Sequence, residues 1–475
     1  MNSANKGGVL ASWLLMLAGC SQPAAVPDRA FTEEPVRAGV PAESVDFRRW
    51  LRLIEELELL DLQRELGARH RPQNWLLQNG IPVDVRNGRL ESRSDLQLAN
   101  GQIQRIGSGS PPSPLTINLD GGYVVPGLVD MHVHGLESTS QPLLNILHGV
   151  TRVRDMDGFA WMLKQREQVR EGRLFAPSMM VTGTILNQSE MDWYAQVVTT
   201  TEAAKSTVRE QAKAGYDAIK VHNNLSPEVL GAIFEQAREL RIDVVGHIPH
   251  QVSVAQALDL GYRTAEHFKG YLDDRALTIA TDNWREASLG AELWNTPTLQ
   301  AHRAHLRGAA ASAVINNSES AMMSPLDLIE WQRAAAEPVD EVTRIRLAAR
   351  SKADQIFRIL LADGGRFLAG TDSGGGYPFM VYGRTLIREL EDFQSLGMDP
   401  SRVLRSATLE AALASRQEGQ FGEIRTGAAA DLLVLDTNPR TASSSRPSPA
   451  RRPATPLVSM PWASATWIGT APSIC

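Results

Sequence analysis

Short apolar runs alternate with amphipathic segments along most of the chain after residue 128. The runs have the length and composition of buried strands, and they lie at residues 129–134, 150–156, 178–183, 217–222, 243–248, 263–268, 294–299 and 366–372. Between them, segments such as 201–215 and 226–240 repeat apolar positions at helical spacing, and Ser226 followed by Pro227 marks a helix start. Eight strand–helix units predict an α/β fold, a (β/α)8 TIM barrel whose active site lies at the carboxyl ends of the strands.

Two different patterns precede this repeat. Residues 44–81 begin with apolar positions near helical spacing, which predicts an N-terminal helical segment packed on the domain surface. Residues 82–125 alternate strand-like runs with the pairs Asn87–Gly88 and Asn100–Gly101, and Asn-Gly is a strong signal for a tight hairpin turn. We therefore expect a small β unit just before the first barrel strand.

Composition and charge exclude some classes of function. The chain has 475 residues, of which 43% are hydrophobic, so it can bury a large core. The 48 basic and 54 acidic residues leave a formal net charge of -6 without a basic face or run, which argues against nucleic-acid binding. The pattern favours a globular protein that acts on a small molecule or a peptide.

Residues 1–20 have the pattern of an export signal. Lys6 precedes an apolar stretch that is too short to span a bilayer, and this stretch closes on the tetrapeptide LAGC at residues 17–20. The tetrapeptide resembles a bacterial lipobox, in which the cysteine is lipid-modified and becomes the mature N-terminus. Residues 21–43 are rich in Pro, Ala and Glu and predict a tether between the lipid and the folded part.

The lipobox resemblance implies an exported protein that is held in the periplasm by a lipid on Cys20. Ser21 at the next position favours the outer membrane where the host has one. The alternative is an ordinary secretory signal in which Cys20 is incidental. Cys475 is the only other cysteine, so the mature chain has no internal disulfide framework.

Metal-capable side chains stand on several of the predicted strands, near their ends. Successive side chains of a strand point to opposite faces, so His132 and His134 share a face and two imidazoles can converge on one ion. The other groups are Lys220 on the fourth strand, His247 on the fifth, His267 on the sixth and Asp372 on the eighth. A single buried histidine is more often a hydrogen-bonded core residue, and a single aspartate can organise a turn. Their joint arrangement at one end of the barrel favours a metal site.

Three motifs resemble those of the amidohydrolase superfamily. GGYVVPGLVDMHVHG resembles the family's entry motif, AGTDSG its last-strand motif, and FGEIRTGAAADLLVLDTNP the segment that returns to a side β-sandwich. The likeness runs from about residue 82 to 439 and is strongest to the prolidase and imidazolonepropionase-like branch. It implies a barrel at 126–415 and a composite β-sandwich from residues 82–125 and 416–439.

The resemblance also implies a binuclear metal centre. In the branch with a lysine on strand four, carbon dioxide carboxylates that lysine, which then bridges two ions. On this pattern His132, His134 and Asp372 hold the more buried ion, His247 and His267 hold the other, and carboxylated Lys220 joins them. Zinc fits the mixed nitrogen and oxygen ligands best, with manganese, iron or cobalt as alternatives. Two ions acidify a shared water, and Asp372 would be the catalytic group that accepts its proton.

The expected reaction is hydrolysis of a C–N bond by a hydroxide that bridges the two ions. The substrate would be a dipeptide of the Xaa-Pro kind or an N-acyl amino acid. The alternatives are a cyclic amidase, a lactonase or esterase on the same site, and a non-catalytic barrel lipoprotein. The presence of every expected ligand favours the enzyme.

His222 and His250 are candidate substrate contacts in the loops after the strands, and Arg384 is another candidate for binding a substrate carboxylate. The sequence leaves open whether the chain forms a homo-oligomer.

The composition changes abruptly at Arg440. Residues 440–475 contain no Asp, Glu or Lys but have six prolines, four arginines and clustered serines, which fits poorly with a regular strand. One interpretation is a disordered extension. The other is translation out of frame, which would leave the sandwich short of a strand and expose an edge while the barrel site survives. Translating the coding DNA in its two other frames decides between them.

Overall fold

The computed structural model describes residues 60–68, 74–134, 140–190, 195–273, 278–280, 283–374, 377–440 and 466–468. The predicted signal peptide, the tether and Cys20 lie outside these ranges, and so does most of the predicted tail. Among the helices of the described ranges, none is long and apolar enough to cross a membrane.

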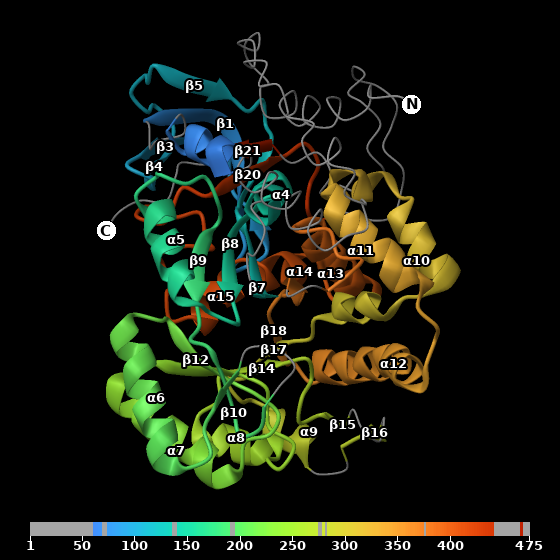
Figure 1. Cartoon of the computed structure of the whole chain (residues 1–475). Coiled ribbons are helices and arrows are strands. Elements are labelled where there is room, and N and C mark those ends of the chain that lie inside the picture. Colours follow the sequence, from blue (N-terminus) through green and yellow to red (C-terminus); the bar gives the residue numbers. More distant parts are fainter. Residues whose placement is uncertain are drawn as a thin grey trace. The chain divides into compact units, whose positions relative to one another are not determined.

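A (β/α)8 barrel forms the centre of the fold (Figure 1). Its strands are β7 (Leu128–His134), β8 (Val150–Asp155), β9 (Ser178–Val181), β12 (Ala218–Val221), β13 (Asp243–Gly246), β14 (Thr264–Glu266), β17 (Trp294–Thr296) and β18 (Arg366–Phe367). Parallel pairing joins β7 to β8 and β9, β12 to β13, and β14 to β17 and β18. A bridge from Thr182 to Ala218 links β9 to β12, and the Met131 amide donates to the Ala369 carbonyl to close the ring. All the predicted barrel strands are confirmed.

Helices follow the barrel strands and cover them. In chain order they are α4 (Ser140–Leu147), α5 (Ala160–Arg170), α6 (Thr201–Ala214), α7 (Pro227–Leu240), α8 (Val254–Leu260), α9 (Trp284–Ser288), the 3-10 helix η1 (Leu299–His305), α10 (Gly308–Ile315), η2 (Ser318–Met322), α11 (Pro325–Ala336), α12 (Glu341–Ala362), α13 (Arg384–Ser395), α14 (Pro400–Ser406) and α15 (Leu409–Ala414). The predicted start of α7 is confirmed, because the Ser226 hydroxyl accepts from the Val229 amide and Pro227 opens the helix.

Short strands occur in the connections between barrel elements. They are β10 (Ile185–Asn187) and β11 (Ala195–Val197), the pair β15 (Leu272–Asp273) and β16 (Thr278–Ile279), and β19 (Ser373–Gly374). β10 pairs with β12, and β19 pairs with β7 beside His134. The connection after strand eight is therefore tied directly to the first barrel strand.

A β-sandwich is assembled from both sides of the barrel sequence. Its strands are β1 (Trp75–Asp84), β2 (Arg89–Leu90), β3 (Ser94–Ala99), β4 (Gln102–Gly107), β5 (Leu115–Asn118), β6 (Tyr123–Pro126), β20 (Leu432–Leu435) and β21 (Thr466–Ile468). Figure 1 shows β20 and β21, in red, beside the blue strands from the other end of the chain, and β20 pairs antiparallel with β6. The predicted turn at Asn100 and Gly101 is confirmed, since both have positive φ and Ala99 pairs with Gln102.

Two boundaries differ from the sequence prediction. β1 begins at Trp75, inside the predicted helical segment 44–81, because Trp75, Leu76 and Leu77 pair with β3 on one side and β5 on the other. Thr466–Ile468 form a strand within the predicted unstructured tail, and they pair antiparallel with β20. The β-branched and aromatic side chains of this short stretch favour a strand despite the composition around it. A short strand from the tail therefore lies beside β20, and the choice between the two interpretations of the tail still depends on the coding DNA.

Candidate metal centre

The carboxyl ends of the barrel strands bring all six predicted ligands into one region. His132 and His134 end β7, Lys220 lies on β12, and His247 directly follows β13. His267 follows β14, and Asp372 lies between β18 and β19. His132 and Lys220 have no exposed surface, and Asp372 and His247 are 7% exposed. Their grouping confirms the arrangement that the sequence predicts, while their role as ligands stays a prediction.

Asp372 is the centre of the cluster. Its Oδ1 lies 2.9 Å from His134 Nε2, 3.3 Å from His132 Nε2 and 4.0 Å from His267 Nε2. Oδ1 is buried, yet it accepts no hydrogen bond of good geometry from any described residue. Ligand atoms of His132, His267 and Asp372 all lie within 4.8 Å of one another. Nitrogen and oxygen atoms that face one another in this way suit a cation between them.

Lys220 and His247 are the remaining two members of the cluster. Lys220 Nζ lies 3.4 Å from His132 Nε2. The His247 ring packs edge-on against the His267 ring with centroids 4.9 Å apart. The two groups of ligands that the resemblance implies are therefore contiguous, and Lys220 lies against the His132 side of the cluster.

Three imidazoles have their Nδ1 atoms fixed by hydrogen bonds. His132 Nδ1–H donates to Glu266 Oε2 at 2.8 Å, and His247 Nδ1–H donates to Asn223 Oδ1 at 2.7 Å. His267 Nδ1 lies 2.6 Å from Thr298 Oγ1, which must accept because its own proton goes to the Pro297 carbonyl. In each ring, Nδ1 carries the proton and Nε2 keeps its lone pair. A neutral imidazole in this form can bind a metal ion through Nε2.

Glu266 and Arg154 form a buried ion pair behind His132. Arg154 donates to Glu266 Oε1 at 2.7 Å and to the Met131 carbonyl at 2.7 Å, while the other Glu266 oxygen holds His132. The sequence prediction missed these residues together with Asn223 and Thr298. A Glu and an Arg inside apolar strand patterns were an available signal, because such charges are rarely buried unless they are paired.

The backbone is strained at several positions in this region. His267, Thr298 and Asp372 have φ values of 58°, 49° and 64°, in the left-handed region that side-chain-bearing residues rarely adopt. Thr298 is β-branched, which makes its conformation especially unfavourable. Strain of this kind persists where surrounding contacts hold it and clusters at functional sites.

Burial keeps the imidazoles neutral. It lowers the pKa of His132, His247 and His267 well below the ordinary value, and the charge of Lys220 lowers each of them further. Burial also lowers the pKa of Lys220, to about 8. For Asp372, burial opposes ionisation, but the neighbouring His267, His134 and Lys220 outweigh it, and the pKa lies below the ordinary value. Neutral imidazoles beside an ionised carboxylate are the protonation states that metal binding requires.

The donor set therefore fits divalent metal ions. An aspartate oxygen without a hydrogen bond, imidazole Nε2 lone pairs and a buried lysine share one region whose outer hydrogen bonds are already made. Zinc accepts such nitrogen and oxygen ligands, although the ligand set does not exclude manganese, iron or cobalt.

The three candidate substrate contacts have different surroundings. The His222 ring lies against His247 with centroids 4.1 Å apart, and its buried Nδ1 has no partner within the described ranges. His250 is exposed, and its amide donates to the Asn223 carbonyl. Arg384 is held by Glu391 at 2.8 Å on α13. His222 is thus the candidate that the structure brings to the cluster.

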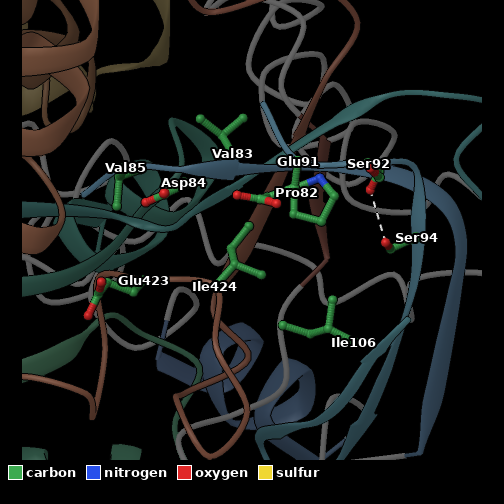
Figure 2. Close-up of a pocket in the computed structure, with 10 residues that line it drawn as sticks. All are labelled: Pro82, Val83, Asp84, Val85, Glu91, Ser92, Ser94, Ile106, Glu423 and Ile424. Carbon is green, nitrogen blue, oxygen red and sulfur yellow. Dashed lines mark hydrogen bonds between the residues drawn. The ribbon is translucent and has the colours of Figure 1, made fainter. Parts of the chain in front are cut away.

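A pocket on the sandwich is a separate hollow (Figure 2). It has a volume of about 320 Å³ and is lined by Pro82, Val83, Asp84, Val85, Glu91, Ser92, Ser94, Ile106, Glu423 and Ile424. Asp84 accepts hydrogen bonds from the amides of Arg86 and Asn87, and Glu423 binds the Arg86 guanidinium. Its lining includes none of the histidine cluster, so we place the candidate chemistry in the barrel.

Solved structures of several hydrolases resemble the whole fold. A bottromycin amidohydrolase superposes with a TM-score of 0.64 at 25% identity, covering 82% of this chain and 87% of that one. A Xaa-Pro dipeptidase with bound methionine gives 0.60 at 20% identity, with coverage of 78% and 95%. A putative prolidase from Bifidobacterium longum gives 0.61 at 21% identity, with coverage of 78% and 90%. The similarity to the Xaa-Pro dipeptidase and to the putative prolidase shows that the three proteins share a fold.

Curated relatives match shorter parts of the chain. A dihydroorotase from Pelobacter propionicus is 26% identical over 254 residues, which cover 52% of this chain and 58% of that protein. An adenine deaminase from Desulfatibacillum aliphaticivorans is 28% identical over 129 residues, which cover 24% and 22%. The matched part is thus less than two thirds of either relative.

The amidohydrolase family itself matches residues 123–467, from the last sandwich strand before the barrel to the strand that returns after it. This chain belongs to the amidohydrolase family.

Proposed function

We propose that the protein is a metal-dependent hydrolase that cleaves a C–N bond with a binuclear centre. The convergence of His132, His134 and His267 on Asp372 Oδ1, beside a buried lysine, is the observation that carries this proposal. Membership of the amidohydrolase family supports it, because the cluster occupies the barrel that the family match covers.

The division of ligands follows the resemblance to the branch with a lysine on strand four. His132, His134 and Asp372 would hold one ion, and His247 and His267 would hold the second. Lys220 would bridge the two as a carbamate, which forms when its neutral amine adds carbon dioxide, makes one N–C bond and releases one proton. No carboxylate lies within ion-pair distance of Lys220 in the described ranges. A carbamate replaces this buried cation with an anion that offers two oxygen ligands.

Individual side chains have separate roles in the proposed reaction. Divalent ions bound here supply Lewis acidity, which acidifies water and polarises the scissile carbonyl. Asp372 is ionised and lies at the centre of the cluster, so it can accept the proton of the attacking water and return it to the departing amine. Glu266, Asn223 and Thr298 hold three imidazole rings in place throughout. His222 would contact the substrate, and its ring beside His247 supports this role.

Dipeptides and N-acyl amino acids are the substrates that we propose first. Both prolidase-like structures share this fold, and the motifs of the sequence resemble that branch most. Cyclic amides are the second class, because the match to a dihydroorotase extends over half of the chain.

A substrate panel with metal control tests the proposal. The protein is assayed as isolated, after chelation, and after zinc is restored, on dipeptides, N-acyl amino acids, cyclic amides, lactones and esters. We expect hydrolysis of at least one C–N substrate that chelation abolishes and zinc restores. Hydrolysis of esters or lactones alone, or activity that survives complete metal removal, would contradict the proposal.

We further propose that the chain is exported and anchored to a membrane by a lipid on Cys20. The support is the LAGC tetrapeptide after a short apolar stretch. Cys20→Ser should leave the protein either unprocessed or soluble outside the cytoplasm, as fractionation and mass spectrometry of the N-terminus report. Normal cleavage with unchanged membrane association would reject the lipid as the anchor.

A further inference from the structure

Glu389 is a fully buried acidic side chain outside the metal cluster, and burial raises the pKa of its carboxyl group well above the ordinary value. It lies on α13 with no exposed surface. Its Oε1 accepts from the Leu299 amide at 2.8 Å, and its Oε2 accepts from the Gln300 amide at 2.9 Å. Burial is costly for a carboxylate, so both oxygens are committed to the first two amides of η1.

Thr298 immediately precedes these two amides. Its left-handed conformation, with φ of 49°, is unfavourable for a β-branched residue and needs support from its surroundings. Its hydroxyl oxygen receives the Nδ1–H of His267 at 2.6 Å. The residue that orients His267 is therefore adjacent in the chain to the residues that Glu389 holds.

The same turn is fixed from α12 as well. Arg350 on α12 donates to the Leu299 carbonyl at 3.2 Å and to Asp392 of α13 at 2.9 Å. Gln300 also donates to Asp392. The start of η1 is thus held by two helices, and Glu389 accepts from both of its first two amides.

We propose that Glu389 is a positioning residue that acts on His267 through Thr298. By binding the amides of Leu299 and Gln300 it fixes the start of η1, and this keeps the Thr298 hydroxyl where it orients the His267 imidazole. The inference rests on the proposed function in one respect, namely that His267 binds a metal ion.

The substitution Glu389→Gln tests whether both carboxylate oxygens are needed. Glutamine has nearly the same shape but only one acceptor oxygen, so its amide group would face an N–H that also donates. We expect the Thr298 hydroxyl to lose its fixed position. One of the two zinc ions should bind about 10- to 100-fold more weakly, which is the usual effect of removing a hydrogen bond to a metal-binding histidine.

A double substitution tests whether the effect passes through Thr298. Thr298→Val removes the hydroxyl and should weaken the same zinc ion by a similar factor. If Glu389 acts through this hydroxyl, adding Glu389→Gln to Thr298→Val should weaken zinc binding little further, because the two changes are coupled. Thr298→Ser keeps the hydroxyl and should preserve zinc binding.

The measurements are zinc titration of the full chain and nitrogen-15 NMR of its histidines without metal. In the metal-free protein, Glu389→Gln should shift or broaden the His267 Nδ1–H signal. Glu391→Gln, on the same helix but paired with Arg384, should leave this signal and zinc affinity unchanged. Asp431→Asn, a partly buried substitution next to the sandwich strand β20, should change stability without changing either readout.

Three outcomes would overturn the inference. They are an unchanged His267 signal in Glu389→Gln, fully additive losses in the double variant, and an equal loss of zinc affinity in Asp431→Asn, which would indicate a general effect of altered stability. Failure of the unsubstituted protein to bind zinc would instead defeat the proposed function, and the His267 signal would then decide the positioning role by itself.

Discussion

Lys220 places a positive charge where cations are expected to bind. Its Nζ lies 3.4 Å from His132 Nε2, and burial lowers its pKa to about 8. An ammonium at this position would repel a metal ion, whereas a carbamate would attract one and bridge to a second. The chemistry of the centre therefore depends on the covalent state of one side chain.

Replacing Lys220 tests that state. Lys220→Ala removes the bridging oxygens, so we expect metal content to fall and activity to drop by several orders of magnitude. Short carboxylic acids added to the solution should restore part of both, because they can occupy the vacated space and supply two oxygens. Metal analysis and the substrate assay check this.

Lys220→Arg serves as the matched control, because it keeps a cation of similar length that carbon dioxide does not carboxylate. It should be as inactive as Lys220→Ala and should not respond to carboxylic acids. Unchanged activity in Lys220→Ala would show that the lysine is not part of the centre.

The candidate ligands could be predicted from the sequence because each stands at the end of a regular apolar run. Alternation within a strand gives the direction of a side chain, and the barrel places all strand ends on one face. Their partners could not be predicted in this way. Arg154 and Glu266 are far apart in the sequence, and they meet only because the barrel brings their strands together. Thr298 lies after strand seven, and its role depends on an unusual backbone conformation.

At the scale of secondary-structure elements, the eighth strand approaches the first very closely. A Cβ atom added at Gly370 would lie 2.5 Å from Thr296 Cγ2 and 3.0 Å from the His132 Cβ. The Thr371 and Asp372 amides both donate to the His132 carbonyl, so Gly370 lies directly beside the backbone that carries a ligand. Only glycine fits here without moving that backbone.

Gly370→Ala is therefore expected to disturb both stability and metal binding. Forcing a methyl group into a well-packed interior lowers the free energy of unfolding by about 1–3 kcal/mol. Displacement of His132 should also weaken zinc binding. Urea unfolding and zinc titration measure the two effects.

Gly231→Ala is the control, because Gly231 lies inside α7 with open space around its Cα. Alanine is the better helix former, so this change should raise the free energy of unfolding by about 1 kcal/mol and leave zinc binding unchanged. Full stability and full zinc affinity in Gly370→Ala would contradict the close approach of strands one and eight.

The periodicity of apolar residues predicted the type of most secondary-structure elements, but it did not predict the positions of two strands. The barrel strands and the helices α6 and α7 match their predicted segments, because both apolar spacing and capping residues indicate them. The start of β1 at Trp75 was missed because a helical pattern ends shortly before it and pairing partners lie elsewhere in the chain. β21 was missed because three residues carry too little pattern to outweigh a proline-rich surrounding segment.

At the scale of the molecule, a partly buried ion pair joins the barrel to the sandwich. Arg152 on β8 lies 4.0 Å from Asp431, which immediately precedes β20, and its guanidinium covers the Phe421 ring at 4.2 Å. The Gly127 amide donates to the Asp431 carbonyl, so the backbone is tied at the same point. Burial raises the pKa of Asp431 to about 6 against the opposing effect of Arg152.

This shift predicts a pH dependence of stability. A carboxyl whose pKa is higher in the folded state than its unfolded value of 3.8 binds its proton more tightly when folded. Its contribution to the free energy of unfolding is therefore greatest below pH 3.8 and is lost as the pH rises through about 6. The full loss amounts to about 3 kcal/mol.

Comparison with Asp431→Asn isolates this contribution, because asparagine does not titrate. The difference in free energy of unfolding between the original protein and the variant should fall from about pH 4 to pH 6.5 and stay level above that. Urea unfolding across this range measures it. A difference that stays level over this range and rises only below about pH 4 would mean that Arg152 dominates and that the pKa of Asp431 is lowered instead.

The central claim is that the cluster at the carboxyl ends of the strands binds two metal ions. The most direct test is the metal content of protein purified without chelator in medium supplemented with zinc, measured by mass spectrometry alongside a folded His132→Ala, His134→Ala variant. We expect close to two transition-metal ions per chain in the unsubstituted protein and no more than one in the variant. A metal content near zero in the unsubstituted protein, or equal content in both, would contradict the account.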